Sequence, residues 1–146
     1  MEKYDALKLE NQLCFPLYAC AKEVVKQYRP FLDELNLTYT QYIAMMVLWE
    51  HEKLNVKELG EKLYLDSGTL TPVLKSLEAK GFLRRYRSEE DERVLNVELT
   101  AAGWNLRDAA LDVPGKVNAG IKLNAGEVVQ LYELLYKVLG GLNEEE

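Results

Sequence analysis

Residues 66–99 constrain the fold more than any other segment of this 146-residue chain, because a helical pattern there passes directly into a strand pattern. Asp66 or Ser67 is suited to cap a helix that ends at Gly81, a residue that tolerates the left-handed position after a helix. The segment therefore predicts a helix that packs on a second helix and leads into a sheet. The apolar residues of its packing face, spaced three or four apart, are Leu70, Val73, Leu74 and Leu77.

Two strands are predicted immediately after this helix, over residues 82–87 and 94–99. The second run alternates, with Leu95, Val97 and Leu99 facing inward and polar residues facing outward. The residues between the two runs, SEEDER, are charged and suit an exposed tip. The pattern predicts a two-stranded hairpin.

Two further helices are predicted before residue 66, each from a capping box. Thr38 with Gln41 opens a helix through about residue 50, and Asn55 with Glu58 opens a short helix after it. Three short helices followed by a hairpin are typical of a winged helix-turn-helix, so the fold class is mainly helical with a small β-hairpin wing. The first of these helices is expected to bury Tyr42, Ile43, Met46, Val47 and Trp49.

The N-terminal end of the chain is predicted to be helical over residues 7–28, with two adjacent apolar stripes. Pro16 interrupts this pattern, because an interior proline lacks an amide donor and clashes one turn back. We expect the helix either to kink at Pro16 or to restart there, with Phe15 pushed toward an extended backbone.

The C-terminal end repeats this apolar character. Thr100 is suited to cap a helix that the pair Pro114 and Gly115 breaks, and Asn124 with Glu127 opens a last, strongly apolar helix. Because both ends are broadly apolar, they are candidates for a dimer interface. We therefore expect dimerisation helices in residues 1–36 and 113–146, and a DNA-binding winged helix-turn-helix in residues 37–112.

The charge distribution limits where an anionic partner can dock. The chain has a net charge of −6, but residues 52–87 contain eight basic and five acidic residues. No segment approaches the roughly 20 apolar residues of a membrane helix, so a soluble cytoplasmic protein is expected.

The two cysteines have neither a disulfide-framework nor a zinc-ligand spacing, and we expect no metal and no cofactor.

Two sets of residues in the basic region suit contact with double-stranded DNA. The helix after residue 66 presents a small, hydroxyl-rich outer face, which fits a major groove where hydroxyls meet phosphates and base edges. The hairpin carries arginines suited to an adjacent minor groove, and Asp91 is close enough to Arg93 to pair with it. The alternatives are an ordinary surface helix and a solvated acidic loop. The predicted contacts are Ser67, Thr69, Thr71, Lys75, Arg84, Arg85, Arg87, Asp91 and Arg93.

The stretch LDSGTLTPVLKSLEAKGFLRRYRSEEDERVLNVELT resembles the recognition helix and wing of MarR-type regulators, including the signature D-x-R-x5-L-T. The signature residues are Asp91, Arg93, Leu99 and Thr100. The resemblance implies a two-fold homodimer, built from the terminal helices, that represses transcription at pseudo-palindromic operators. It also implies that the helix beginning near residue 67 enters the major groove and that Arg93 enters the minor groove.

The motif KLENQLCFPLYACAKEV resembles the sensor region of the organic-hydroperoxide repressors of the OhrR type, and more loosely that of their SarZ and MgrA relatives. The resemblance implies that Cys14 is oxidised by organic hydroperoxides and that Tyr18, Tyr28 and Tyr39 contact it. No cysteine follows Cys20, so this would be a one-cysteine sensor whose sulfenic acid reacts with a low-molecular-weight thiol or is over-oxidised.

The chemistry of thiols also supports Cys14 as the oxidised residue. Thiolate is the reactive species, and the amides of a helix that restarts at Pro16 would favour a Cys14 anion. Cys14 as a small buried apolar residue remains the simpler alternative. Cys20 lies six residues on and on a different helix face, so we expect it to pack and to be inert.

Helix geometry places the tyrosines at different distances from Cys14. Tyr18 lies one turn from Cys14, whereas Tyr28 is 14 residues away, about 21 Å along a straight helix. Tyr28 would reach the thiol of a second subunit if the first helices of a dimer cross antiparallel.

Two other functions compete with a peroxide-sensing repressor. The first is a MarR-type repressor that responds to a small phenolic ligand or acts without redox input. The second is a thiol peroxidase that uses Cys14, although the sequence has no pattern typical of a substrate pocket with a general base.

Overall fold

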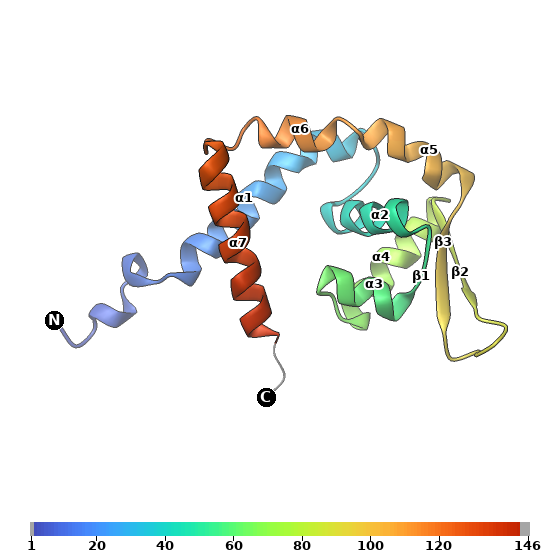
Figure 1. Cartoon of the computed structure of the whole chain (residues 1–146), viewed down its shortest axis with the longest axis horizontal. Coiled ribbons are helices and arrows are strands. Elements are labelled where there is room, and N and C mark those ends of the chain that lie inside the picture. The colour runs from blue at the N-terminus through green and yellow to red at the C-terminus, as the bar shows by residue number, and fades with distance from the viewer. Residues whose placement is uncertain (1, 144–146) are drawn as a thin grey trace. The chain divides into compact units, whose positions relative to one another are not determined.

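The computed structural model describes residues 2–143, which form seven α-helices, two short 3₁₀ turns and three strands (Figure 1). Among these residues, 2–114 form one compact unit and 115–143 form a second. The elements in chain order are η1 (Asp5–Leu7), η2 (Leu9–Asn11), α1 (Cys14–Asp33), α2 (Tyr39–His51), β1 (Lys53–Asn55), α3 (Val56–Leu63), α4 (Ser67–Ala79), β2 (Leu83–Arg87), β3 (Leu95–Leu99), α5 (Ala101–Ala110), α6 (Val113–Asn118) and α7 (Ala125–Leu142).

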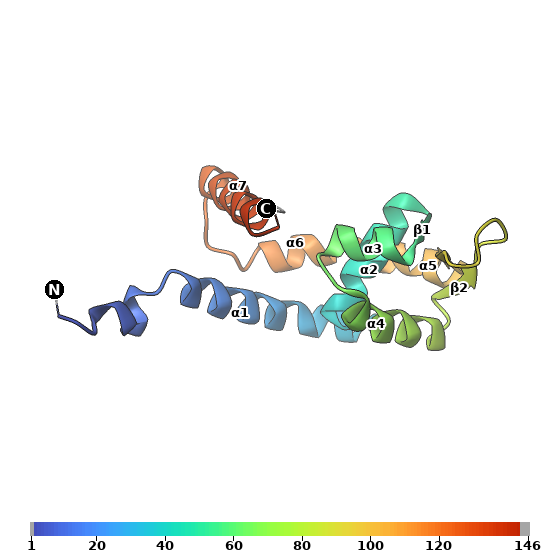
Figure 2. The ribbon, with the colours of Figure 1, turned by 90° about the horizontal axis from the view of Figure 1, so that it is seen from below.

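Helix α1 begins at Cys14 and runs to Asp33, so the predicted helix over residues 7–28 is wrong at both ends (Figure 2). Phe15 is helical rather than extended, and Pro16 is the third residue of the helix. A proline is tolerated there because the first amides of a helix have no intrahelical acceptor. The expected restart of the helix near Pro16 is therefore correct to within two residues.

The three central helices begin where the caps predict. The Thr38 hydroxyl accepts from the Gln41 amide, and the Gln41 side chain accepts from the Thr38 amide, which completes the capping box of α2. Asn55 and Glu58 form the same reciprocal pair at α3. Asp66 caps α4, and Gly81 adopts a φ of 84° just after that helix.

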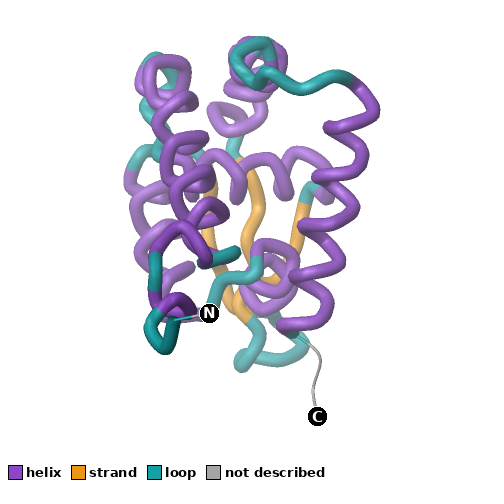
Figure 3. The backbone as a smooth tube through the Cα atoms, turned by 90° about the vertical axis from the view of Figure 1, so that its left-hand side faces the viewer, coloured by secondary structure: helices purple, strands orange, loops and turns teal. Residues whose placement is uncertain are grey.

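The predicted hairpin is confirmed, with Leu83 paired to Leu99 and Arg87 paired to Leu95 (Figure 3). The structure adds a third strand, β1, which the sequence did not predict. It pairs with β3 antiparallel, and the sheet order is β1-β3-β2.

The core of the first unit lies between these helices and the sheet. The expected packing face of α4 is largely confirmed, since Leu70, Leu74 and Leu77 are buried, while Val73 is half-buried. The prediction for α2 is wrong in part: Tyr42 is buried, but Met46 is 42 % exposed and Met45 takes its place in the core. The largest fully buried side chains are Leu32, Met45, Leu48, Leu59, Leu70, Leu74, Leu77, Leu83 and Val97.

The C-terminal part departs from prediction at one point. Helix α5 ends at Ala110, before the proline, and Pro114 lies in the first turn of α6 rather than at a break. The last helix, α7, begins after Asn124 and Glu127, which form the predicted capping box. Within residues 2–143, no helix is long and apolar enough to cross a membrane.

Candidate nucleic-acid interface and thiol site

The first turns of α4 present a small polar surface. Ser67, Thr69 and Lys75 are exposed and Thr71 is half-buried, so the predicted groove-facing residues lie along one accessible stretch of the helix. The Asp66 side chain accepts from the Thr69 amide at 2.8 Å, and this hydrogen bond lowers the pKa of Asp66. The carboxylate is thereby occupied in capping, and the Thr69 side chain also bonds to it. Ser67 remains exposed beside it.

Arg85 joins the sheet to α4. Its backbone amide donates to Glu78 at 2.9 Å, and its guanidinium donates to the same carboxylate at 3.0 Å. These contacts hold the pKa of Glu78 below its usual range, with the Arg85 amide as the larger cause and the guanidinium next. The Arg85 side chain is only 19 % exposed, so it fixes the hairpin against α4 rather than projecting from it.

Arg84 lies on the outer face of the sheet. Its guanidinium contacts Glu98 on the facing strand and lies 4.5 Å from the centre of the Tyr86 ring. The Tyr86 hydroxyl donates to Glu98 at 3.3 Å. Arg84 is thus partly neutralised, whereas Arg87 at the end of β2 is exposed.

The tip of the hairpin holds the predicted pair of Asp91 and Arg93. The guanidinium of Arg93 donates to the two carboxylate oxygens at 3.0 and 3.1 Å, and its backbone amide donates to the same group at 3.1 Å. The Arg93 hydrogen bond lowers the pKa of Asp91. The Arg93 side chain is nevertheless 88 % exposed, so it is oriented while remaining accessible.

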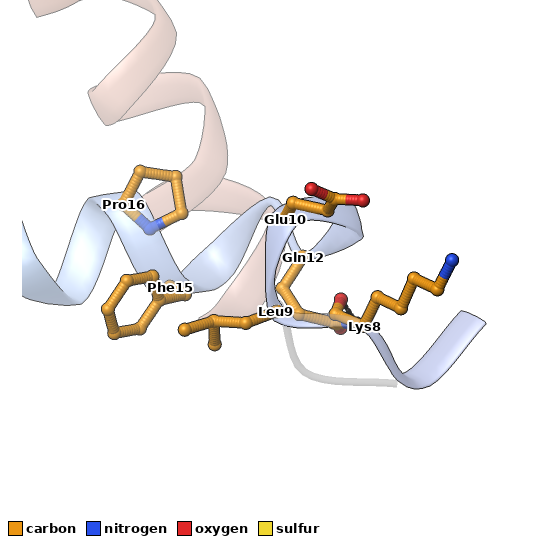
Figure 4. A pocket seen from close by; sticks show the side chains of 6 residues that line it. All are labelled: Lys8, Leu9, Glu10, Gln12, Phe15 and Pro16. Carbon is orange, nitrogen blue, oxygen red and sulfur yellow. Dashed lines mark hydrogen bonds between the residues drawn. The ribbon is translucent and has the colours of Figure 1, made fainter. Parts of the chain in front are cut away.

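The thiol of Cys14 is free and exposed at the first residue of α1. Tyr18, one turn further on, is also exposed. The residues before α1 fold back, because Gln12 donates to the carbonyl groups of Ala6 and Lys8 at 2.7 Å. Figure 4 shows side chains that line an open hollow at this end of the chain, Leu9, Phe15 and Pro16 among them. The volume of the hollow is about 730 Å³.

The structure places Tyr28 and Tyr39 away from this thiol, at the other end of α1. Their ring centres lie 4.9 Å apart, and Tyr42, which the sequence did not single out, lies 5.7 Å from Tyr28. Burial raises the pKa of Tyr28, and burial with its two neighbours raises that of Tyr42 to about 12. All three form the tyrosine cluster, which brings together two of the predicted sensor residues.

Cys20 does not pack as expected. Its thiol is free and exposed in this chain, so the predicted burial is wrong for a single subunit. The reason lies in α1, whose only buried residue is Leu32. The other residues of α1 are exposed or half-buried.

Comparison with known proteins assigns the chain to a family. The family described as transcriptional regulator SarA/Rot matches residues 26–109. The organic hydroperoxide resistance transcriptional regulator of Bacillus subtilis is 52 % identical over 143 residues, which cover 98 % of this chain and 97 % of that protein. The chain belongs to the MarR superfamily of transcriptional regulators, in its organic-hydroperoxide branch. SarZ of Staphylococcus saprophyticus, a second member, is 42 % identical over 92 % of both chains.

Solved structures of this superfamily share the winged helix-turn-helix fold. Reduced AbfR bound to DNA superposes with a TM-score of 0.79 at 32 % identity, covering 98 % of this chain and 100 % of that one. The MepR–DNA complex of Staphylococcus aureus has a TM-score of 0.80 at 22 % identity, covering 89 % of this chain and 98 % of that one, and shows the fold alone. The relatives are named as transcriptional regulators and not as enzymes, which favours a regulator over a thiol peroxidase.

Proposed function

We propose that this MarR-superfamily regulator is a homodimeric repressor that releases its operator when an organic hydroperoxide oxidises Cys14. The observation that carries the proposal is the free, exposed thiol of Cys14 at the first residue of α1. The two residues that follow it in the helix, Phe15 and Pro16, line a hollow together with Leu9. The apolar half of the lining, Leu9, Phe15 and Pro16, favours a peroxide with an organic substituent over hydrogen peroxide, and the other half is the polar Lys8, Glu10 and Gln12. The similarity to a hydroperoxide-resistance regulator supports the same assignment.

The proposed reaction is a two-electron oxidation of sulfur. The Cys14 thiolate attacks the terminal peroxide oxygen, the O–O bond breaks as the S–O bond forms, and an alcohol leaves after taking up a proton. The product is a sulfenic acid on Cys14. A low-molecular-weight thiol then condenses with it, forming a mixed disulfide and water.

The DNA-binding surface proposed for the repressor combines α4 and the hairpin. Ser67, Thr69, Thr71 and Lys75 enter the major groove, and Arg93 enters the adjacent minor groove. The fork between Asp91 and Arg93 supports this role, because an arginine already oriented loses less freedom on binding. The same superfamily fold is found bound to DNA in the AbfR and MepR structures.

The other hairpin arginines take different roles in this proposal. Arg87 contacts the DNA backbone from the end of β2, whereas Arg84 contributes less positive charge because Glu98 partly neutralises it. Arg85 acts by holding the hairpin at a set angle to α4 through Glu78.

Dimerisation through residues 1–36 and 113–146, around the winged helix-turn-helix of residues 37–112, accounts for the exposed apolar side chains of both ends. Residue 1 and residues 144–146 of these ranges lie outside the described residues. Exposed apolar side chains this numerous are typical of a protein–protein interface. They include Leu17, Val24 and Val25 on α1, and Val128, Leu131, Leu134, Leu135 and Val138 on α7.

A direct test compares the two cysteines. Purified protein, Cys14→Ser and Cys20→Ser are each treated with cumene hydroperoxide and a small thiol, and operator binding is followed by a mobility-shift assay. We expect the parent and Cys20→Ser to release the operator and Cys14→Ser to remain bound. Normal release of Cys14→Ser would show that oxidation of Cys14 is not the switch.

A second candidate function is release by a small phenolic ligand. A separate cavity of about 200 Å³, lined by Val25, Arg29 and Tyr39 among others, favours it, because an arginine beside apolar and aromatic groups suits an aromatic ligand with a polar substituent. Asp33 also lines this cavity and offsets the charge of Arg29. Release of Cys14→Ser by salicylate without any peroxide would support this alternative over the redox switch.

A further inference from the structure

Gln41 is the buried polar side chain among residues 2–143, at 6 % exposure, and its hydrogen bonds join α2 to α4. Its amide nitrogen donates to the Ser76 hydroxyl on α4 at 2.9 Å. Its carbonyl oxygen accepts from the Thr38 amide at 3.0 Å and from the Lys80 ammonium at 2.8 Å. Gln41, which forms the capping box of α2 with Thr38, therefore also bonds to the last turn of α4, the proposed recognition helix.

Lys80 extends this connection to the loop before α2. Its ammonium donates to the carbonyl oxygen of Asn36 at 2.6 Å, in addition to its bond with Gln41. Asn36 has a φ of 58°, so the loop turns sharply at this residue. We call Gln41, Ser76 and Lys80 the polar link.

The first turn of α2 contains Gln41, one member of the polar link, and part of the tyrosine cluster. Tyr39 and Tyr42 flank Gln41 in sequence, and both lie against Tyr28 of α1. Successive residues of one helical turn move as a rigid group, because their backbone hydrogen bonds fix their relative positions. A displacement of the cluster therefore displaces Gln41, and Gln41 is bonded directly to α4.

We infer that the polar link is the connection through which a change at the tyrosine cluster resets the orientation of α4. This inference rests on the proposed function, and it takes Tyr28 as the residue that contacts Cys14 of a partner subunit, as helix geometry allows when the first helices cross antiparallel. Gln41 is a positioning residue in this scheme, since it touches neither the oxidant nor DNA. A buried amide whose partners move loses hydrogen bonds that water does not replace, so α4 follows α2 instead of separating from it.

The test measures how strongly oxidation of Cys14 changes operator affinity, and not operator affinity alone. Ser76→Ala removes the acceptor of the Gln41 amide, and Ser76→Thr keeps a hydroxyl at the same place as the matched control. For each protein, the operator Kd is measured in the reduced form and after oxidation with cumene hydroperoxide and a small thiol. The ratio of the two Kd values is the release factor, and the rate of Cys14 oxidation is recorded in parallel by mass spectrometry.

We expect Ser76→Ala to bind the operator in the reduced form within about twofold of the parent, but to lose most of a release factor that in coupled systems is about 5- to 150-fold. Its Cys14 oxidation rate should equal that of the parent, and Ser76→Thr should restore the release factor. Lys80→Met, which removes the ammonium and keeps the length of the side chain, should lower the release factor in the same direction.

Three results would overturn the inference, and they differ from one another. If both Ser76→Ala and Lys80→Met keep the parental release factor, the polar link does not transmit the change from Cys14 to α4, although Cys14 still acts as the sensor. Weaker operator binding in both redox forms, together with a lower melting temperature and an unchanged ratio, assigns the link a purely structural role. No release of the oxidised parent refutes the proposed function itself, and the inference with it.

Discussion

Tyr28 offers a sharp test of whether the sensor is shared between subunits. In one chain, Cys14 begins α1 and Tyr28 lies 14 residues further along it, so the two are about 21 Å apart and cannot touch. Burial raises the pKa of Tyr28, so its hydroxyl keeps its proton at neutral pH and can donate to a thiolate. A hydrogen bond to a charged group contributes about 1.5–3 kcal/mol, which corresponds to a change in reaction rate of about tenfold or more.

The perturbation is Tyr28→Phe, which removes the hydroxyl but keeps the ring that packs on Tyr39 and Tyr42. Two mixed dimers each carry a single Cys14 thiol, the surviving thiol, and each also keeps Cys20 in both subunits. In the first, a Cys14→Ser subunit is paired with a Tyr28→Phe subunit, so the surviving thiol faces an intact Tyr28 of the partner. In the second, a Cys14→Ser, Tyr28→Phe subunit is paired with a parental subunit, so the surviving thiol faces phenylalanine.

The rate of Cys14 oxidation is measured under an excess of cumene hydroperoxide. Samples are quenched with a thiol-trapping reagent, and mass spectrometry reports the fraction of Cys14 that has reacted. We expect the first dimer to react at the parental rate and the second to react about tenfold more slowly, like the Tyr28→Phe homodimer. Equal rates in the two mixed dimers would refute the shared site. The reverse order would place the effect of Tyr28 within its own chain.

Three further predictions concern the wing and its support. Arg93→Ala should weaken operator binding by roughly tenfold or more if the side chain reaches a base edge, and unchanged affinity at moderate salt would remove it from recognition. Gly103→Ala should destabilise the fold by roughly 1–3 kcal/mol in thermal unfolding, because its Cβ would lie 2.1 Å from a main-chain oxygen just before β2. Gly68→Ala is the control, since its Cβ has no contact closer than 3.5 Å, and equal melting temperatures for the two would contradict the clash. Arg85 lowers the pKa of Glu78, so this contact stabilises the fold at neutral pH and is lost as the pH falls through that lowered pKa. Glu78→Gln should therefore flatten the acid side of the curve of stability against pH, and an unchanged curve would count against the contact.

The elements that the sequence predicted well are those determined by local chemistry. Capping boxes at Thr38, Asn55 and Asn124, and the left-handed Gly81, each depend on residues within one turn of the helix end. The alternation of β3 likewise predicted the buried Val97 and Leu99. These signals do not depend on how the rest of the chain packs.

The errors have tertiary or competing causes. The apolar stripes of residues 7–28 extend across Gln12, but its side chain bonds to backbone carbonyl groups and keeps the preceding residues in short turns. Strand β1 has three residues and exists because it pairs with β3, more than 40 residues away in the chain. The buried face of α2 was misplaced because residues 42–49 are all apolar, so periodicity does not distinguish Met45 from Met46.

The candidate site was predictable in its residue types more than in its contacts. The pair of Asp91 and Arg93 is two residues apart and was predicted, whereas the attachment of Arg85 to Glu78 depends on how the sheet meets α4. The inclusion of Tyr42 in the tyrosine cluster follows from the packing of α1 on α2, which no local pattern describes.

The exposed apolar side of α1 makes the proposed dimer dependent on the concentration of the protein. Leu17, Val24 and Val25 are 44 %, 37 % and 39 % exposed in a single chain, so in the proposed dimer their further burial makes folding and pairing one equilibrium that depends on protein concentration. On dilution, such a molecule loses its sensor and its paired recognition helices together. The number of copies in a cell then sets a threshold, below which the regulator responds to neither peroxide nor operator.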